Sequence, residues 1–463
     1  MVTFKVNPGR RAWAFETSRK AAGRPRVGCR NERASGGERI VGIEMKILKR
    51  DDFNDLDELR RSLGWDFWME EIPGAEVREI VERVRRDGDA ALVELTREFD
   101  GVDISSKGLR VTAAELDASS SAVGREFSEA ARAAVRSITA FHRHQTWESD
   151  FWDSEEGARL GQMLRPIQRV GAYVPGGMAA YPSTAMMTVI PAKVAGVQEI
   201  AVCVPPGRDG NVDPHTLFAL KLLGVGEVYR VGGAQAVAAM AFGTETVGAV
   251  EKIVGPGNMY VTLAKKEVFG LVGIDMLAGP SELVVIADEE ADEEFVALEM
   301  LAQMEHGGGA RACLITTRED MALKVGKRLE GSVSASGNTA TVVLVDGLEE
   351  GVRIANHLAP EHLLLAVADF PSFLPKVHNA GSVFLGTESP VALGDYAVGV
   401  NHVLPTRGAA RYASPLGVYD FVKRSNIVFS NSKANRALGR VVQALAEMEG
   451  LLGHADAMRR HLR

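Results

Sequence analysis

From about residue 171 the sequence alternates between short, almost wholly apolar runs and helix-like segments. The apolar runs include EIAVCVPP, EVYRVGG, EKIVG, ELVVIAD, ACLITT and TVVLVDG, and segments such as PHTLFALKLLG and AQAVAAMAFG separate them. Apolar strands that alternate with helices are typical of parallel sheets covered on both faces, because such strands have no solvent-facing side. The runs are too many for one small sheet, so the sequence predicts two α/β domains.

Helical segments flank this region. Apolar residues in 55–145 recur with a spacing close to 3.6, interrupted at Gly88, and the chain from Ser432 onward is amphipathic. No complete GxGxxG motif follows the first predicted strand. The turns YVPGGMAAYPS and IVGPGNMY are nevertheless glycine-rich and lie at strand ends, where open α/β sheets bind ligands. We therefore expect incomplete, Rossmann-like parallel sheets with a helical N-terminal segment and a helical C-terminal tail.

Composition and charge exclude several classes of protein. The chain is 46% hydrophobic and 25% charged, and no run approaches the 18 apolar residues that a membrane span requires. The net charge is -8; residues 1–44 hold ten Lys/Arg and four Asp/Glu, so they carry +6 and the remainder carries -14. An acidic body argues against nucleic acid as a partner. We expect neither a nucleic-acid partner nor a membrane.

The basic N-terminus lacks the apolar segment of a secretory signal. We expect residues 1–44 to be a disordered extension, because MKILKRDDF, which begins at Met45, resembles the start of a protein chain. An organellar transit peptide is the alternative. The cysteines Cys29, Cys203 and Cys313 form no disulfide framework, which fits a reducing compartment. Cys203 and Cys313 lie in apolar strand-like runs. A cytoplasmic location is the expectation.

The stretch LAQMEHGGG contains a candidate metal-binding pair. Gln303 and His306 are three residues apart, so in a helix they share a face while Glu305 points elsewhere. Histidine is a common metal ligand. A polar helix end is the commoner explanation of such a pair when it is considered alone.

A second stretch, APEHLLLAV, places Glu361 and His362 side by side at the head of an apolar run. A carboxylate next to an imidazole is a plausible acid-base pair. The alternative is a helix start, because proline at the first position and an acid in the first turn both favour helix N-termini.

Two further stretches carry histidines near acids. GDYAVGVNHVLPT holds Asp395 and His402 in a loop punctuated by glycine and proline, a common place for site residues, although Asp395 alone also suits an Asx turn. EGLLGHA holds Glu449 and His454 near the C-terminus, where an exposed residue without function is the default.

The segment IDMLAGPSELVVIADEEADEEFVALEMLAQMEH, from Ile274 to His306, resembles the signature of the histidinol dehydrogenases. The resemblance extends over 45–463 through RVGAYVPGG, VGGAQAVAAMAFGT, GPGNMYVTLAKK, LAPEHL, AGSVFLG, GDYAVGVNHVLPT and EGLLGHADA. The sequence departs from the family pattern at MEHGGGARA and by a short deletion between His306 and Pro360. Both changes alter a loop and leave every candidate site residue in place.

The resemblance implies zinc-dependent oxidation of L-histidinol to L-histidine through L-histidinaldehyde, with two NAD+ and one Zn2+ per subunit, in a homodimer with shared active sites. Carried over by motif, it assigns the zinc ligands Gln303, His306, Asp395 and His454; the acid-base residues Glu361 and His362; the NAD contacts Tyr173, Gln235 and Asn258; and the substrate contacts Ser281, Gln303, His306, His362, Asp395, His402, Glu449 and His454. It also implies that Glu449 and His454 reach the site from the partner subunit.

These expectations divide the chain into five parts. They are the disordered basic extension, 1–44; a helical part packing onto the first α/β domain, 45–172; a second α/β domain on the NAD side, 173–282; the remainder of the first domain with the zinc and acid-base residues, 283–415; and a helical, dimer-forming tail, 416–463. Two alternatives stay open. One is a paralogous zinc and NAD dehydrogenase acting on another small amino- or sulfo-alcohol, and the other is a non-catalytic, metal-dependent ligand-binding protein.

Overall fold

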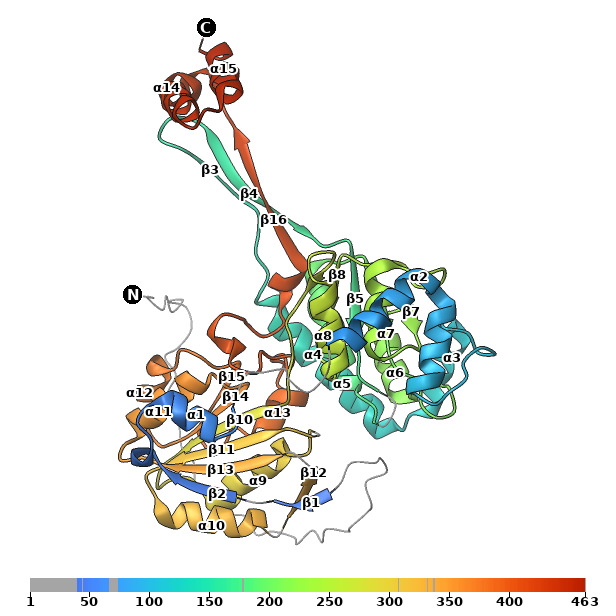
Figure 1. Cartoon of the computed structure of the whole chain (residues 1–463), viewed down its shortest axis with the longest axis vertical. Helices are drawn as coiled ribbons and strands as arrows, with labels where there is room; N and C mark the ends of the chain where they lie inside the picture. The colour runs from blue at the N-terminus through green and yellow to red at the C-terminus, as the bar shows by residue number, and fades with distance from the viewer. Residues whose placement is uncertain are drawn as a thin grey trace. The chain divides into compact units, whose positions relative to one another are not determined.

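The computed structural model of the protein describes residues 40–43, 45–65, 74–176, 179–306, 308–330, 332–335 and 338–462. The predicted extension therefore lies outside the described residues apart from 40–43. Two parallel sheets, each flanked by helices, form the bulk of the described chain (Figure 1). This architecture confirms the predicted α/β class with two α/β domains.

The first sheet has six strands, all parallel to their neighbours. In spatial order they are β15 (Ser382–Leu385), β14 (His362–Ala366), β10 (Glu282–Ala287), β11 (Arg311–Thr316), β13 (Thr339–Leu344) and β2 (Met45–Lys49). The edge strand β2 comes from near the start of the described chain, whereas the other five strands lie between residues 282 and 385. The domain is therefore formed by two separate segments of the sequence. A small antiparallel pair, β1 (Ile40–Gly42) with β12 (Val333–Ala335), accompanies it.

Alternate side chains of the central strands enter two separate cores, as period-two geometry requires. Leu283 and Val285 pack with helices α9 (Glu293–Gln303) and α10 (Glu319–Glu330). Val284 and Ile286 pack on the other face with α1 (Leu56–Ser62) and α11 (Leu348–Leu358). Both faces of β10 are thus buried, which explains why ELVVIA shows no polar alternation. Two shorter helices, α12 (Phe370–Phe373) and α13 (Val391–Tyr396), follow later in the same domain.

The second sheet has five parallel strands. In spatial order they are β7 (Glu227–Tyr229), β6 (Glu199–Cys203), β5 (Arg169–Tyr173), β8 (Lys252–Val254) and β9 (Gly273–Ile274). Helices between these strands are α5 (Pro182–Ala195), α6 (Pro214–Leu222), α7 (Gly233–Phe242) and α8 (Met259–Val268). From β5 the chain adds β6 and β7 on one side and returns to add β8 and β9 on the other, so the strand order reverses between β5 and β8.

The helices predicted in 55–145 are present, but most of them pack elsewhere than expected. They are α1, α2 (Gly74–Phe99), α3 (Ala113–Ala122) and α4 (Arg125–Arg143), and α2 is interrupted at Gly88 as the sequence indicated. Only α1 joins the first domain. Helix α2 contacts α7 and α8, α3 contacts α6, and α4 contacts α5, all in the five-stranded domain. The expectation that this part packs onto the first domain is wrong for α2–α4, because periodicity marks an apolar face without naming its partner.

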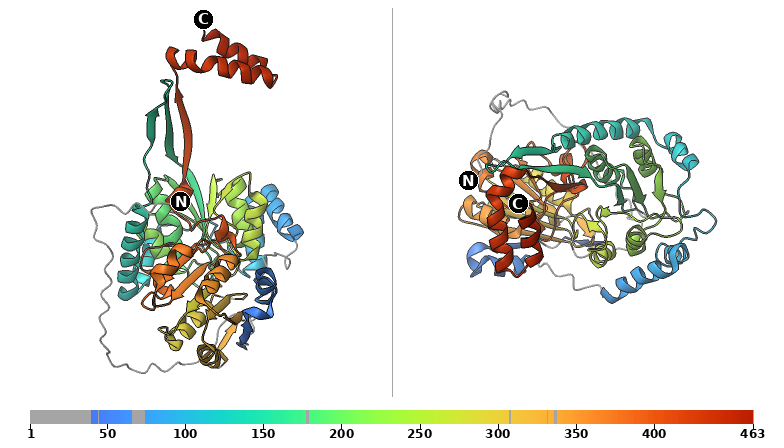
Figure 2. Two further views of the ribbon diagram at one scale, coloured as in Figure 1. Left: turned by 90° about the vertical axis from the view of Figure 1, so that its left-hand side faces the viewer. Right: turned by 90° about the horizontal axis from the view of Figure 1, so that it is seen from above.

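The C-terminal tail begins with a strand that the sequence analysis did not predict. β16 (Val422–Phe429) pairs antiparallel with β4 (Arg159–Pro166), which also pairs with β3 (Asp150–Asp153). The two helices α14 (Ser432–Met448) and α15 (Leu452–Arg460) follow and pack on each other. Figures 1 and 2 show these strands leading away from the two parallel sheets to α14 and α15. We call β3, β4, β16, α14 and α15 the arm.

Two smaller expectations concern cysteines and membranes. Cys203 and Cys313 are the cysteines within the described residues, and both are free and buried in strands. No helix in the described part of the chain is long and apolar enough to cross a membrane.

The six-stranded core yields a stability prediction. Leu314 on β11 is fully buried, so Leu314→Ala removes well-packed methyl groups and leaves a cavity; we expect it to lower the free energy of unfolding by about 2–5 kcal/mol. Leu323→Ala on α10, where the side chain is 59% exposed, is the matched control and stays within about 0.5 kcal/mol of the parent. Urea unfolding measures both. Equal effects of the two substitutions would contradict the burial described for β11.

Candidate active site

The amino-terminal edge of the six-stranded sheet brings the predicted acid-base pair against a neighbouring strand. His362 is the first residue of β14, and its register partner on β10 is Leu283. Glu361 and His362 are buried. The alternative explanation of APEHLLLAV as a helix start is wrong: the stretch enters a central strand, because four consecutive apolar residues are buried on both faces of the sheet.

One residue of β10 orients both members of the pair through its backbone. The Glu282 N–H donates to Glu361 Oε2 at 2.9 Å, and the Glu282 carbonyl lies 3.3 Å from His362 Nδ1. Because a carbonyl only accepts, Nδ1 of His362 must donate to it. Proton exchange at His362 is thereby assigned to Nε2, which lies 3.5 Å from Asp395 Oδ1.

Burial and mutual charge shift the proton affinities of this cluster. Burial opposes the charged form of His362, but the carboxylates of Glu361 and Asp395 outweigh it and raise the pKa of His362 to about 9. Burial likewise raises the pKa of Glu361 to about 7, against the opposing effect of the His362 imidazole. Perturbed acid-base groups that share one buried location are typical of functional sites.

Glu282 is a site residue that the sequence analysis missed. Its side chain is buried, and its carboxylate Oε1 accepts the Arg407 N–H at 3.1 Å. Arg407 adopts a positive φ of 55°, rare for a residue with a side chain, so this contact ties a strained turn to the head of β10. Burial, followed by the charge of Glu361, raises the pKa of Glu282 to about 8. The available signal was an acid placed directly before an apolar strand in AGPSELVVIA.

The predicted metal-binding pair lies at the end of the helix that follows β10. Gln303 is the last residue of α9 and is 2% exposed, and its Nε2 finds no hydrogen-bond partner among the described residues. His306 follows on the next turn, where desolvation lowers the pKa of its imidazole and Asp395 opposes that effect. An unpaired buried amide is costly unless a ligand completes it. Gln303 therefore fits a ligand-binding role better than a polar helix end, whereas Glu305 and His306 are both exposed.

Three histidine side chains act electrostatically on the carboxylate of Asp395. His306, His362 and His402 each lower the pKa of Asp395, and together they overcome the burial that would raise it. His402 donates from Nδ1 to the Asp395 carbonyl at 2.8 Å, and its Nε2 lies 3.4 Å from Thr184 Oγ1 on α5. Asp395 lies in α13 and His402 in the loop after it, so that helix and loop bring both residues to the edge occupied by His362.

The same neighbourhood contains Ser281 but not the two predicted C-terminal residues. Ser281 directly precedes β10, and its hydroxyl hydrogen-bonds to the Glu361 carboxylate and so favours its ionised form. Glu449 and His454 are exposed on the arm, at the end of α14 and within α15. Figures 1 and 2 place these helices away from β14 and α13. No group of three His, Cys, Asp or Glu within the described residues is arranged to hold a metal.

The predicted cofactor residues lie at the carboxyl edge of the five-stranded sheet. Tyr173 ends β5, Gln235 lies in the first turn of α7, and Asn258 is the N-cap of α8, so they flank the reversal of strand order between β5 and β8. Tyr173 and Gln235 are buried, and the Tyr173 hydroxyl accepts the Gly233 N–H at 3.2 Å. Asn258 is exposed and caps its helix by accepting the Val261 N–H at 3.1 Å.

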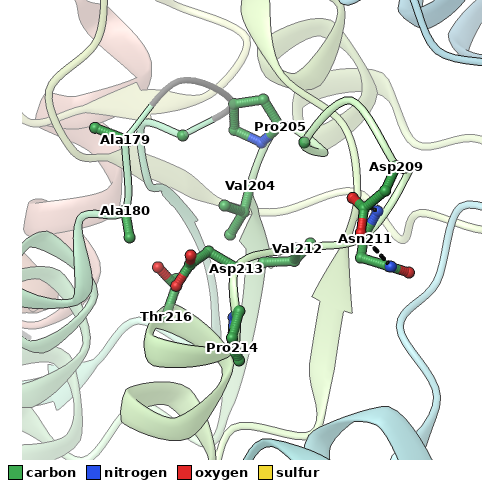
Figure 3. Close-up of a pocket in the computed structure, with 12 residues that line it drawn as sticks. Ala179, Ala180, Val204, Pro205, Asp209, Asn211, Val212, Asp213, Pro214 and Thr216 are labelled. Atoms are coloured by element: carbon green, nitrogen blue, oxygen red, sulfur yellow. Dashed lines mark hydrogen bonds between the residues drawn. The ribbon is translucent and has the colours of Figure 1, made fainter. Parts of the chain in front are cut away.

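A pocket of about 200 Å³ opens at the same sheet edge, on the β6 side of β5 (Figure 3). Gly176 lies beyond the end of β5, and Val204 and Pro205 follow β6 directly. Asp213, which lines the pocket, caps α6 by accepting the His215 N–H. This pocket is separate from the turn that carries Asn258, because that turn follows β8 on the opposite side of β5.

Comparison with known proteins gives a consistent result. A family model described as histidinol dehydrogenase matches residues 70–462. Histidinol dehydrogenase from Moorella thermoacetica is 48% identical over 414 residues, which cover 87% of this chain and 98% of the relative. The enzyme of the same name from Rhizobium meliloti is 47% identical and is matched over 84% of this chain and 92% of its own length. The chain belongs to the histidinol dehydrogenase family.

Structural comparison agrees. The crystal structure of histidinol dehydrogenase from Elizabethkingia anophelis matches with a TM-score of 0.82 at 33% identity, covering 91% of this chain and 98% of that one. Family membership makes this protein an NAD-dependent dehydrogenase and an oxidoreductase. The family resemblance predicted from the segment Ile274 to His306 is thus confirmed.

Proposed function

We propose that the protein oxidises L-histidinol to L-histidine through L-histidinaldehyde, as the last steps of histidine biosynthesis, with two NAD+ and one Zn2+ per subunit. Relatives that bear the name histidinol dehydrogenase support the substrate. The observation that carries the proposal is the buried Glu361–His362 pair, which is fixed by Glu282 and lies against Asp395. A protein that only bound its ligand would not require such an acid-base pair.

The zinc ligands in this proposal are Gln303, His306 and Asp395 from one subunit and His454 from the other. The lowered pKa of Asp395 fits this role, because a metal ligand must be deprotonated. Gln303 is buried and would present its amide oxygen. When bound, zinc supplies Lewis acidity and a fixed point for orienting the substrate. One subunit offers only one histidine and one carboxylate of this set, which is consistent with the absence of a three-residue cluster among the described residues.

The first oxidation requires a base for the hydroxyl proton. The Asp395 carboxylate is among the groups that raise the pKa of His362, and a zinc ion bound by Asp395 would offset that effect. The neutral ring would then accept the proton at Nε2, because Nδ1 is committed to the Glu282 carbonyl. NAD+ supplies the acceptor for the hydride that leaves the same carbon. The alcohol thus loses one proton to the protein and one hydride to the cofactor, which leaves the aldehyde.

The second oxidation requires water, because the aldehyde carbon must gain an oxygen before a hydride can leave. Glu361, whose pKa is raised to about 7 by burial, is suited to take a proton from that water as the hydrate forms. His362 returns the proton of the first step to the aldehyde oxygen as the hydrate forms, and it is then free to act again as the base for the second hydride transfer. One base that serves both steps lets a single site complete the reaction without releasing the reactive aldehyde.

A thiohemiacetal route through cysteine is disfavoured by the structure. Cys203 and Cys313 are fully buried in central strands, and burial raises the pKa of each thiol to about 12. A nucleophilic cysteine needs a lowered pKa and access to the substrate. Neither condition holds for these two residues.

His362→Asn tests the catalytic proposal. Asparagine retains a polar side chain but cannot serve as a base, so we expect histidinol-dependent NADH formation to fall about 10²–10⁴-fold, while histidinol binding measured by calorimetry persists. Assays of the parent protein with other small amino- and sulfo-alcohols discriminate the paralogous alternative. If zinc-replete parent protein binds histidinol without turning it over, the ligand-binding alternative replaces this proposal.

Metal removal tests the zinc assignment. Dialysis against a strong chelator should abolish activity, and added Zn2+ should restore it, because the proposed zinc ion would orient the substrate and supply Lewis acidity. His306→Ala should lower zinc affinity by about 10–100-fold, measured by competition with a metal-sensitive dye. Full activity in protein shown by elemental analysis to contain no metal would refute the assignment.

A homodimer with shared active sites is part of the proposal, and the exposed apolar surface of the arm supports it. Exposed apolar side chains gather on α14 and in the turn before α15, an arrangement that monomeric proteins rarely maintain. They are Leu438, Val441, Val442, Leu445, Met448, Leu451 and Leu452. Glu449 and His454 lie within the same segment. A second copy that covers this surface would deliver both residues to the site of its partner.

Mixed dimers test the sharing of sites. A His454→Ala subunit retains an intact His362, and a His362→Asn subunit retains an intact His454, so a hybrid dimer contains one complete site. For a 1:1 mixture that reassociates at random we expect recovery to about a quarter of parent activity, whereas each variant alone stays inactive. Proven hybrid dimers without any recovered activity would count against sharing.

A further inference from the structure

The turn after β8, residues 255–258, leads into the N-cap of α8 and carries the proposed NAD contact Asn258. Gly255 adopts a φ of 111°, and a Cβ atom at this position would lie 2.1 Å from the Tyr173 carbonyl oxygen. Only glycine fits such a contact. The turn is therefore pressed against the end of β5, at the reversal of strand order where ligands bind in this class of sheet.

A buried ion pair holds both backbone groups of Gly255. Lys265 on α8 donates from Nζ to the Gly255 carbonyl at 3.0 Å and forms an ion pair with Asp275 Oδ1. Asp275 Oδ2 accepts the Gly255 N–H at 2.7 Å, and Oδ1 also accepts the Met276 N–H. The Lys265 and Asp275 side chains are 2% and 0% exposed. We call Lys265 and Asp275 the clamp.

The same face of α8 connects the turn to the substrate side. Asn258, Thr262 and Lys265 follow at intervals of four and three residues, so they lie on one face of the helix. Thr262 Oγ1 donates to the Ala278 carbonyl at 2.8 Å, within the loop that leads from Asp275 to Ser281 and β10. The clamp thus sits where the proposed cofactor turn and the proposed substrate loop are joined.

An ion pair in this position is a costly way to obtain stability alone. Removing two charges from water carries a penalty that the mutual attraction often only balances, and apolar pairs of similar volume are frequently as stable. The clamp directs its hydrogen bonds at the N–H and the C=O of a single glycine, which an apolar pair cannot do. Its geometry therefore serves the conformation of the turn.

We propose that Lys265 and Asp275 are positioning residues that hold the 255–258 turn in its cofactor-binding conformation before NAD arrives. The inference rests on the proposed use of this turn for NAD. A turn that is already ordered does not lose conformational entropy on binding, so the clamp contributes to cofactor affinity without touching the cofactor. The clamp does not take part in proton transfer.

The test compares two neutralised ion pairs of the same sheet. Lys265→Met/Asp275→Asn removes the clamp. Arg169→Met/Glu227→Gln is the control, because Arg169 and Glu227 form an ion pair at the first residues of β5 and β7, at the opposite edge. Fluorescence titration with NADH gives Kd directly, without turnover. We expect Kd to rise at least about tenfold in the clamp variant and to stay within about twofold in the control, although both lose thermal stability.

Kinetics separates positioning from general damage. In the clamp variant the KM for NAD+ should rise about tenfold, while kcat at saturating NAD+ and the KM for histidinol change less than about twofold. Lys265→Gln/Asp275→Asn serves if the first double variant does not fold, because it also leaves no unpaired buried charge. It keeps an acceptor for the Gly255 N–H, and a rise in Kd of at least about threefold is expected.

Unchanged NADH affinity in folded clamp variants would overturn the inference, and so would an equal loss of affinity in the control. If the parent protein and the clamp variants bind NADH equally well, only the inference about the clamp is refuted. Parent protein that binds no NADH refutes the proposed function together with the clamp.

Discussion

The parallel pairing of β10 with β14 is the constraint on which the site depends. This register places the backbone of Glu282 beside Glu361 and His362, so that one N–H and one C=O orient the two side chains. The helix α9, which connects β10 to β11, returns the chain to the amino-terminal edge of the sheet, and α13, which follows β15, brings Asp395 to the same edge. The acid-base pair and the proposed metal ligands therefore meet without belonging to one continuous motif.

Several buried ionisable groups are concentrated at this edge. Burial raises the pKa values of Glu361 and Glu282 to about 7 and about 8, while Asp395 stays acidic because imidazoles surround it. Such a concentration of buried ionisable groups opposes folding stability unless a ligand or cation completes it. In the proposed homodimer the arm of the second subunit would complete the site, because the arm carries Glu449 and His454 next to an exposed apolar surface.

The two sheets contribute opposite edges to the proposed reaction. Glu361 and His362 lie at the amino-terminal end of β14 in the six-stranded sheet. In the five-stranded sheet, Tyr173 ends β5 and Asn258 follows β8. The short segment from Asp275 to Ser281 joins the two sheets, and it is tied to α8 through Thr262 and through the clamp. Cofactor turn and substrate loop are thus parts of one hydrogen-bonded connection. Rigid support of this kind is what holds reacting groups within a productive geometry.

The sequence by itself determined the α/β class, most central strands and the helices of 55–145 with their break at Gly88, because periodicity and composition are local properties. The candidate site residues came from the resemblance of its motifs to a known family. Only the tertiary structure decided that His362 opens a strand and that α2–α4 cover the five-stranded sheet. It also decided that Glu282 bonds to Glu361 and that Lys265 and Asp275 hold Gly255. Glu282 and Glu361 are 79 positions apart in the chain, and strand register alone brings them together. Local patterns carry no information about such pairings, since an apolar face specifies burial but not its partner.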